Sequence, residues 1–151
     1  MTERQPGMDK REFEVKFMRE FPPEFLRAAR ELYLENGWID ESASPDFPRN
    51  AFAGSFLVAA AFAPDGQLAG VGRSLSDGVS DAFIQDVMTA KGFRRRGVGK
   101  LVTTALVEEL KKRGIDWIGL VGVPGTEKFY AECGLKSVPG HTLWMAEGPK
   151  Q

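Results

Sequence analysis

The sequence predicts one mixed α/β domain built on a mostly antiparallel sheet. Three strand-like segments follow one another through turns of a few residues, which is the pattern of an antiparallel meander. Helix-like segments with an apolar stripe lie before and after this meander along the chain. The 151 residues suit a single domain, and they contain no internal repeat, low-complexity segment or linker.

The first third of the chain is predicted to form a strand and two helices. Residues 1–10 are expected to be a flexible polar tail ahead of a single domain at 11–151. Residues 12–17 alternate apolar and polar side chains, the period of a half-buried strand. Residues 24–36 carry apolar side chains at helical spacing, and Gly37 then provides a helix stop. A loop is expected at 38–48 and a short second helix at 49–54.

The middle third is predicted to form the three strands of the meander. Residues 56–63 are apolar throughout, as in a strand that is buried on both faces. Pro64, Asp65 and Gly66 are typical turn residues. The other two strands are expected at 67–75 and 81–89, with a turn at 76–80 between them.

The last third returns to alternating helices and strands. A glycine-containing loop at 91–99 leads into residues 100–113, whose apolar side chains form one helical stripe. A strand at 115–123, a helix at 126–133 and a final strand at 142–146 complete the prediction.

The composition excludes several classes of function. The formal net charge of −1 argues against a general nucleic-acid binder, which needs a strongly basic face. The chain has one cysteine, Cys133, which allows no intrachain disulfide and fits the reducing cytoplasm. One histidine gives no His/Cys metal cluster, and the longest apolar stretch is far shorter than the ~20 residues of a membrane helix. We therefore expect a cytoplasmic protein without metal, membrane or nucleic-acid partners.

Residues 94–100 carry the clearest chemical signal. Three arginines, Gly97, Val98, Gly99 and Lys100 follow a predicted strand and open a predicted helix. A helix N-terminus offers unpaired backbone N–H groups and the positive end of the helix dipole. Glycines allow a ligand close to the backbone. This combination predicts an anion cradle suited to a pyrophosphate.

Two familiar phosphate loops do not match this segment. A P-loop has the pattern G-x-x-x-x-G-K-[ST]. When Gly99 and Lys100 are aligned with its Gly-Lys pair, the first glycine is replaced by Arg94 and the final Ser or Thr by Leu101. A dinucleotide fingerprint requires a third glycine where Val102 stands, and it follows a strand of a parallel unit.

The segment resembles the coenzyme A loop of the GCN5-related N-acetyltransferase (GNAT) family. The family's signature is Gln or Arg, two residues, Gly, one residue, then Gly or Ala, and Arg94, Gly97 and Gly99 match it. Residues 84–89 and Phe93 resemble the family's fourth strand and the aromatic residue before its loop.

A second element downstream extends the resemblance. Residues 129–135 are similar to the family's Phe-Tyr-x-x-x-Gly-Phe element. The resemblance is strong over 81–135 and weak before 56, where acceptor sites vary among relatives. It implies a twisted sheet of about six to seven strands flanked by about four helices. It also implies acetyl-CoA as co-substrate, with no metal.

The resemblance implies a role for each matched residue. Backbone N–H groups of the loop would bind the pyrophosphate, and the 87–89 strand would pair with the pantetheine arm as an added strand. Tyr130 would be the general acid that protonates the leaving thiolate, while an amine attacks the thioester directly in a ternary complex. The implied cofactor-binding residues are Val87, Met88, Thr89, Arg94, Arg95, Arg96, Gly97, Val98, Gly99, Lys100 and Phe129.

The base and the acceptor site depart from the family's pattern. Many relatives carry an Asn after the fifth strand, where this chain has Gly122, and some carry a Glu base where this chain has Phe83. Asp86 and Gln85 are the nearest polar candidates, and an ordered water is an alternative base. A structural role for Asp86, capping a bulge or holding a helix, is an equal alternative to the base role. The expected acceptor site lies between the 38–48 loop and the 81–89 strand, with Trp38, Phe83 and Gln85 as substrate-binding residues.

These features predict an N-acetyltransferase for a primary amine of a small molecule. Acidic residues on the acceptor side, Asp40, Glu41, Asp77 and Asp81, favour a cationic acceptor. The alternatives are acetylation of peptide or protein N-termini, and a non-catalytic acyl-CoA sensor. A nucleotide-binding module is a further alternative that the failed P-loop match disfavours. Tyr130 could also be a core or interface tyrosine. The sequence leaves the oligomeric state open, a homodimer included.

Overall fold

The computed structural model describes residues 12–148, so the predicted tail at 1–10 lies outside the described part. Within it the chain forms five strands, four α-helices and one short 3₁₀ helix. In chain order these are β1 (Glu14–Phe17), α1 (Pro23–Glu35), α2 (Phe47–Ala53), β2 (Leu57–Phe62), β3 (Leu68–Ser76), β4 (Asp81–Thr89), η1 (Lys91–Phe93), α3 (Val98–Lys112), β5 (Trp117–Gly119) and α4 (Glu127–Glu132).

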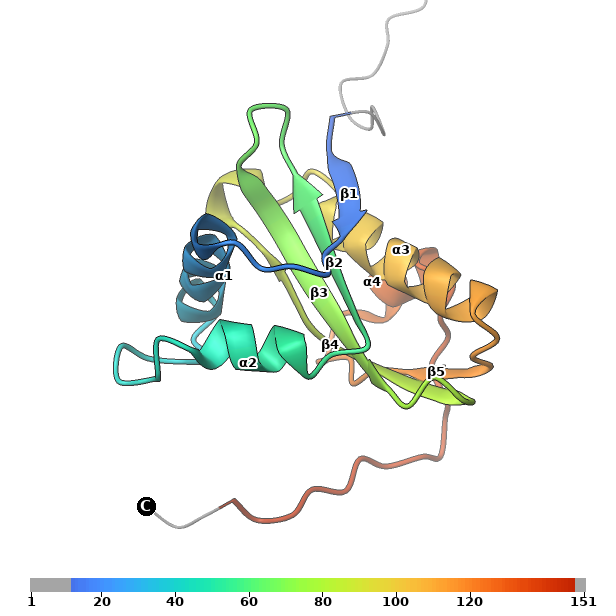
Figure 1. Cartoon of the computed structure of the whole chain (residues 1–151). Coiled ribbons are helices and arrows are strands. Elements are labelled where there is room, and N and C mark those ends of the chain that lie inside the picture. The colour runs from blue at the N-terminus through green and yellow to red at the C-terminus, as the bar shows by residue number, and fades with distance from the viewer. Residues whose placement is uncertain (1–11, 149–151) are drawn as a thin grey trace, which may run out of the picture.

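The five strands form one sheet in the order β1-β2-β3-β4-β5. The first four strands are antiparallel to their neighbours, and β5 alone runs parallel to β4 (Figure 1). Chain connections of a few residues join β2 to β3 and β3 to β4, as the meander predicted. The mixed α/β architecture with a mostly antiparallel sheet is therefore confirmed.

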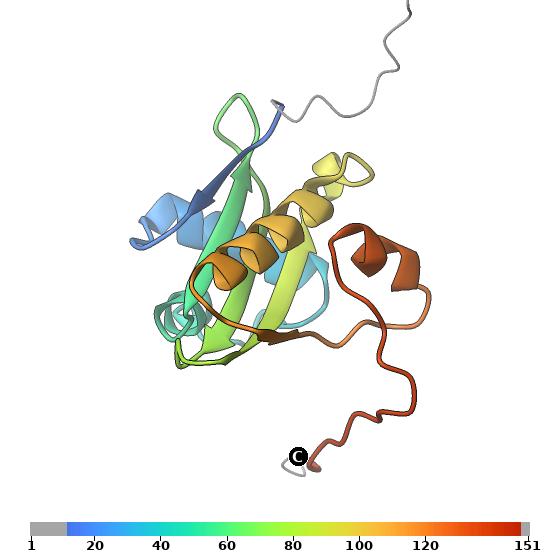
Figure 2. The ribbon, with the colours of Figure 1, turned by 90° about the vertical axis from the view of Figure 1, so that its right-hand side faces the viewer.

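Helices cover both faces of the sheet. α1 and α2 lie on one face, and α3 lies across the other with α4 beside it (Figures 1 and 2). β2 serves both layers, because Leu57, Ala59 and Ala61 join the core under α3 whereas Val58 and Ala60 join the core under α1 and α2. This alternation confirms that the apolar run at 56–63 is a strand buried on both faces.

The ends of two helices differ from the prediction by a few residues. α2 begins at Phe47 because Pro48 fits the first turn of a helix, where its missing N–H costs nothing. α3 begins at Val98 because Gly97 takes the N-cap position, so the glycine pair opens the helix instead of preceding it.

The two predicted C-terminal strands differ most from the structure. The strand expected at 115–123 is paired only over Trp117–Gly119, and its apolar residues Trp117 and Val123 are 58% and 66% exposed. The pairing stops at Gly119, and the segment that follows contains Gly122, Pro124 and Gly125, which disfavour a ladder. The strand expected at 142–146 is wrong: the segment lies outside any helix or strand and has no ladder partner in the described chain. The sheet therefore has five strands and not six to seven. No helix in the described part is long and apolar enough to cross a membrane.

Candidate active site

The loop before α3 has the backbone shape of an anion cradle. Arg95 and Gly97 both adopt positive φ, at 63° and 79°. Among the described residues no side chain caps the start of α3. The first bond within the helix runs from the Leu101 N–H to the Gly97 carbonyl oxygen at 3.0 Å. The N–H groups of Val98, Gly99 and Lys100 precede that bond and are the donors that a helix N-terminus leaves for a ligand.

Gly99 lies where three elements meet. A Cβ atom built on Gly99 would lie 3.3 Å from Phe129 Cζ on α4 and 3.5 Å from Thr89 Oγ1 at the end of β4. A larger side chain would have to displace this contact. Gly99 thus brings the start of α3 against two other predicted cofactor residues.

The side chains of Arg96 and Lys100 are engaged with carboxylates. Arg96 forms an ion pair with Glu12, and its guanidinium lies 5.1 Å from the ring centre of Phe13. Lys100 Nζ lies 3.5 Å from Glu132 Oε2 on α4. Arg94 and Arg95 are exposed. The loop's basic side chains therefore divide into two that tie it to neighbouring elements and two that face solvent.

β4 parts from β5 halfway along its length. The parallel ladder joins only Asp81, Ala82 and Phe83 to β5. From Ile84 to Thr89 the β5-facing side of β4 has no ladder partner in the described chain, while its other side stays paired to β3. Val87, Met88 and Thr89 therefore lie on an open strand edge, which is the kind of edge that accepts an extended ligand.

A β-bulge interrupts β4 at Asp86. The ladder with β3 shifts register between Val71 and Arg73, and Asp86 adopts a positive φ of 55°. Such a backbone is uncommon for a residue other than glycine and is typical of functional or tightly held sites. The bulge sits where β4 begins to part from β5, so it re-aims the strand at the open edge.

The Asp86 carboxylate is held by two neighbours. Its Oδ2 atom accepts hydrogen bonds from Arg73 Nε at 2.6 Å and from the Tyr33 hydroxyl at 2.8 Å. Tyr33 is almost completely buried, and this burial, with the negative charge of Asp86, raises its pKa well above the ordinary value of 10.0. Arg73 also reaches Gln85 Oε1, at 3.4 Å. These contacts fit the alternative in which Asp86 holds the bulge.

One pocket of about 750 Å³ brings the predicted catalytic and acceptor residues together. Trp38, Phe83, Gln85, Asp86 and Tyr130 all line it. The other lining side chains are apolar and come from three places: Ile84 and Val87 of β4, Leu120, Val121 and Val123 after β5, and residues 143–146. Apart from Trp38, no residue of the 38–48 loop lines the pocket, so this loop supplies less of the wall than predicted.

Tyr130 stands at this pocket with its ring packed on two sides. Its ring centre lies 5.0 Å from that of Phe129, edge to face. A Cβ on Gly122 would come within 3.2 Å of the Tyr130 ring. Gly122, which stands where many relatives carry an Asn, therefore makes room for that ring. Burial, followed by the nearby Cys133, raises the pKa of Tyr130 above 10.0. The hydroxyl therefore keeps its proton at neutral pH, as a general acid requires.

Cys133 is buried and makes no approach to the pocket. Its Sγ donates a hydrogen bond to the carbonyl oxygen of Phe129 at 3.4 Å, and burial raises its pKa. A buried thiol with a raised pKa is a poor nucleophile, so Cys133 has the properties of a small core residue.

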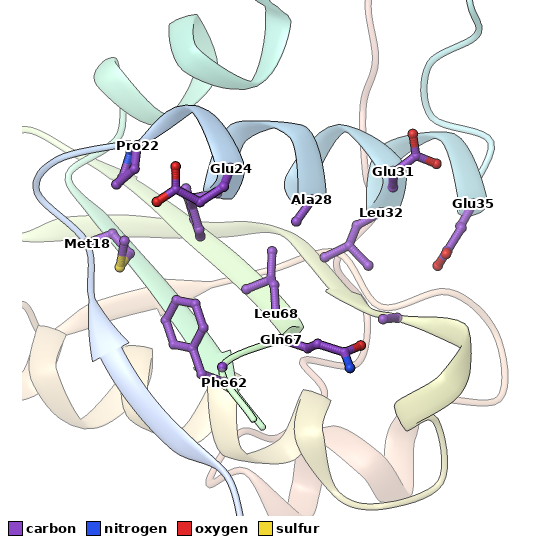
Figure 3. Close-up of a pocket in the computed structure, with 13 residues that line it drawn as sticks. Met18, Pro22, Glu24, Ala28, Glu31, Leu32, Glu35, Phe62, Gln67 and Leu68 are labelled. Atoms are coloured by element: carbon purple, nitrogen blue, oxygen red, sulfur yellow. The ribbon is translucent and has the colours of Figure 1, made fainter. Parts of the chain in front are cut away.

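A second pocket, of about 570 Å³, lies between α1 and the β2–β3 hairpin (Figure 3). Its floor is apolar, with Met18, Phe62 and Leu68, and glutamates of α1 stand along its rim. None of the predicted site residues lines it. It therefore takes no part in the candidate active site.

The sequence did not predict the roles of three residues of the site. Arg73 and Tyr33 act on Asp86 from β3 and α1, and Tyr33 is 53 positions away along the chain. Gly122 was seen only as a departure from the family's pattern. Arg73 is the one charged residue of β3, and it is the signal that could have revealed the network, because a buried cation requires a partner.

Comparison with known proteins identifies the family. Residues 12–135 match the Acetyltransferase (GNAT) family. The chain belongs to the GNAT family. The match covers both the glycine loop and the Tyr130 element.

Two curated N-acetyltransferases match part of the chain. A chloroplastic GCN5-related N-acetyltransferase 1 of Arabidopsis thaliana is 39% identical over 67 residues, which are 44% of this chain and 34% of that protein. An uncharacterized N-acetyltransferase of Pyropia yezoensis is 32% identical over 84 residues, 56% of this chain and 48% of that protein. The matched regions thus span less than half of these relatives.

Solved acetyltransferase structures share the fold. A GNAT-family acetyltransferase from Streptococcus pneumoniae superposes with a TM-score of 0.70 at 20% identity, covering 90% of this chain and 99% of that one. Glucosamine-6-phosphate N-acetyltransferase from Arabidopsis thaliana has a TM-score of 0.64 at 16% identity, with 90% and 97% covered. At these identities the likeness concerns the fold alone.

Proposed function

We propose that this GNAT protein transfers the acetyl group of acetyl-CoA to a primary amine of a small molecule. One observation carries the proposal: the uncapped, glycine-opened start of α3 lies next to the open edge of β4, and that edge leads into the pocket of Tyr130. An anion site, an extended-chain site and a proton donor thus follow one another along a single path.

The proposed cofactor site uses backbone groups. The pyrophosphate binds the N–H groups at the start of α3, where the helix dipole favours negative charge. The pantetheine arm pairs with the open edge at Val87, Met88 and Thr89, and Phe129 packs beside Gly99 at the junction. This direction carries the thioester into the pocket that Val87 and Tyr130 line.

Direct attack by the amine accounts for all atoms of the reaction. The amine nitrogen bonds to the thioester carbon, the carbon–sulfur bond breaks, and the thiolate takes a proton from the Tyr130 hydroxyl. A water chain carries the proton that the amine loses to the Tyr130 phenolate, which regenerates the hydroxyl. Asp86 is not given this step here because its carboxylate already pairs with Arg73 and accepts a hydrogen bond from Tyr33. A base role for Asp86 stays a prediction, which its asparagine variant tests below.

An amine-panel assay tests the proposal. The purified protein is incubated with acetyl-CoA and primary amines, and thiol release and the acetylated product are both measured. The proposal expects amine-dependent release of CoA with a matching amount of acetylated amine. Acetylation of peptide N-termini alone would favour the peptide alternative. CoA binding without any turnover would favour the sensor alternative, and displacement of CoA by ATP would favour a nucleotide module.

A homodimer is part of the same proposal. Leu143, Trp144 and Met145, which also line the acceptor pocket, are 56%, 89% and 80% exposed, and exposed apolar runs of this kind mark interaction sites. A dimer contact here would therefore border the acceptor pocket. β5 is also an edge strand of the sheet. Sedimentation of the protein, compared with a Trp144→Asp variant, tests this: the account expects a dimer that the variant weakens.

A further inference from the structure

The acceptor pocket is far more apolar than a site for a polar or multiply charged amine. Of its lining residues, Asp86 is the only one with a charged side chain. The walls present the rings of Trp38 and Phe83 together with the aliphatic side chains of Leu120 and Val123. An amine that enters must bury whatever body it carries against these groups.

The one charge in the pocket is already compensated. Asp86 Oδ2 accepts hydrogen bonds from Arg73 and Tyr33, and the oxygen of Gln85, the neighbouring polar group, lies 3.4 Å from Arg73 Nη2. Arg73 and Asp86 are mostly buried, at 14% and 21% exposed side chain, and they balance each other's charge. The pocket thus offers no uncompensated anion to an incoming cation.

The acidic residues that favoured a cationic acceptor are engaged outside the pocket. Asp40 accepts bonds from Ser42, and Glu41 lies 3.9 Å from Arg30. Asp77 accepts the Val79 N–H in its own turn. None of these acidic residues, nor Asp81, lines the pocket. They therefore make no direct contact with an amine bound in the pocket.

We infer that the acceptor is a primary amine on an apolar body without a second charge, a class for which an arylalkyl amine is the probe. The inference rests on the proposed function and adds the substrate class. Burial of the ring against Trp38 and Phe83 supplies affinity, whereas a second charge or a hydroxylated body would lose hydration without a partner. The apolar surroundings also disfavour the ammonium form, so they favour the neutral amine that attacks the thioester.

A matched pair of amines tests the inference. 2-Phenylethylamine and ethylamine carry the same reactive group and differ by the ring. Burying a side chain like that of Phe increases affinity by about ten- to hundredfold. We therefore expect kcat/KM for 2-phenylethylamine to exceed that for ethylamine by this factor. Spermidine and glucosamine 6-phosphate should be poorer than 2-phenylethylamine. Equal rates for the pair, or a preference for either polar amine, would overturn the inference.

Two variants locate the effect in this pocket. Trp38→Ala should lower kcat/KM for 2-phenylethylamine about tenfold and leave the KM for acetyl-CoA unchanged. Trp117→Ala is the matched control, because Trp117 is similarly exposed but does not line the pocket. Val123→Asp places an unpaired carboxylate on an exposed wall position, where folding is not at risk, and should shift preference toward spermidine. A Trp38 variant no different from its control would contradict the assignment.

The same assay separates this inference from the function on which it rests. Turnover with polar amines but not with arylalkyl amines overturns the substrate class and leaves acetyl transfer standing. No turnover with any amine, although acetyl-CoA binds, overturns both. Binding of acetyl-CoA is measured separately by calorimetry, so that a loss of cofactor affinity is not mistaken for rejection of an amine.

Discussion

Arg73 on β3 donates a 2.6 Å hydrogen bond from Nε to Oδ2 of Asp86, the residue at which β4 bulges away from it. The contact closes a bulge whose backbone has a positive φ, and it does so at the point where β4 parts from β5. The open edge of β4 and the pocket wall at Gln85 therefore both depend on this pair.

Asp86→Asn separates a structural carboxylate from a catalytic base. The amide oxygen of Asn still accepts hydrogen bonds from Arg73 and Tyr33, but the amide cannot take up a proton at neutral pH. We expect less than a tenfold loss of kcat with a lowered Tm. A loss of about 10²–10⁴-fold in kcat with an unchanged Tm would instead assign general-base catalysis to Asp86.

Asp86→Ala is expected to be much more damaging to stability than the asparagine variant. It leaves a mostly buried Arg73 without its partner, and breaking such a pair costs about 3–5 kcal/mol. Urea unfolding measures the free energy of unfolding of both variants. Equal stability of the two would show that the hydrogen bonds to residue 86 contribute little.

Tyr33→Phe tests the third member of the network. Its hydroxyl donates to a carboxylate, so its removal should lower the free energy of unfolding by about 1.5–3 kcal/mol at neutral pH. The raised pKa of Tyr33 adds a pH dependence with a defined sign. The folded state holds the proton more tightly than the unfolded state, so stability is lost as pH rises above about 10, the ordinary pKa of Tyr. The variant should lose less stability than the wild type between pH 9 and 11.

Tyr130→Phe should lower kcat by about 10²–10⁴-fold with little change in affinity for CoA. Burial raises the pKa of Tyr130 above the ordinary value of 10.0, so Tyr130 stays protonated near neutral pH and causes no loss of kcat between pH 7 and 9. Steady-state rates from pH 7 to 10, with calorimetry of CoA binding, check both statements. Full turnover by the variant would mean that water or another group protonates the thiolate.

Periodic segments of the sequence predicted their elements well. The helical spacing of Phe25, Leu32 and Tyr33 and the apolar run of β2 reflect burial, which each segment's own side chains reveal. The C-terminal segments failed because a strand requires a neighbour. Residues 142–146 have the composition of a strand, but no ladder partner in the described chain lies beside them.

The same distinction applies to the site. The loop at 94–100 and Tyr130 were identified from a contiguous motif, and the pocket does bring Tyr130, Trp38 and Phe83 together. The Arg73–Asp86–Tyr33 network was not foreseen, because it depends on a bulge that shifts register by one residue. A sequence pattern with period two gives no sign of such a shift.

Calorimetric titration of acetyl-CoA into the wild type and the Gly99→Val variant tests the central claim most directly. Valine would push against Phe129 and Thr89 beside the N–H groups proposed to hold the pyrophosphate. Gly92→Val is the matched control, since a Cβ on Gly92 meets nothing within 4 Å. With circular dichroism showing all three proteins folded, the account predicts binding to the wild type and the control, and at least about tenfold weaker binding to Gly99→Val. Equal affinity for a folded Gly99→Val protein would contradict the placement of the cofactor at this loop.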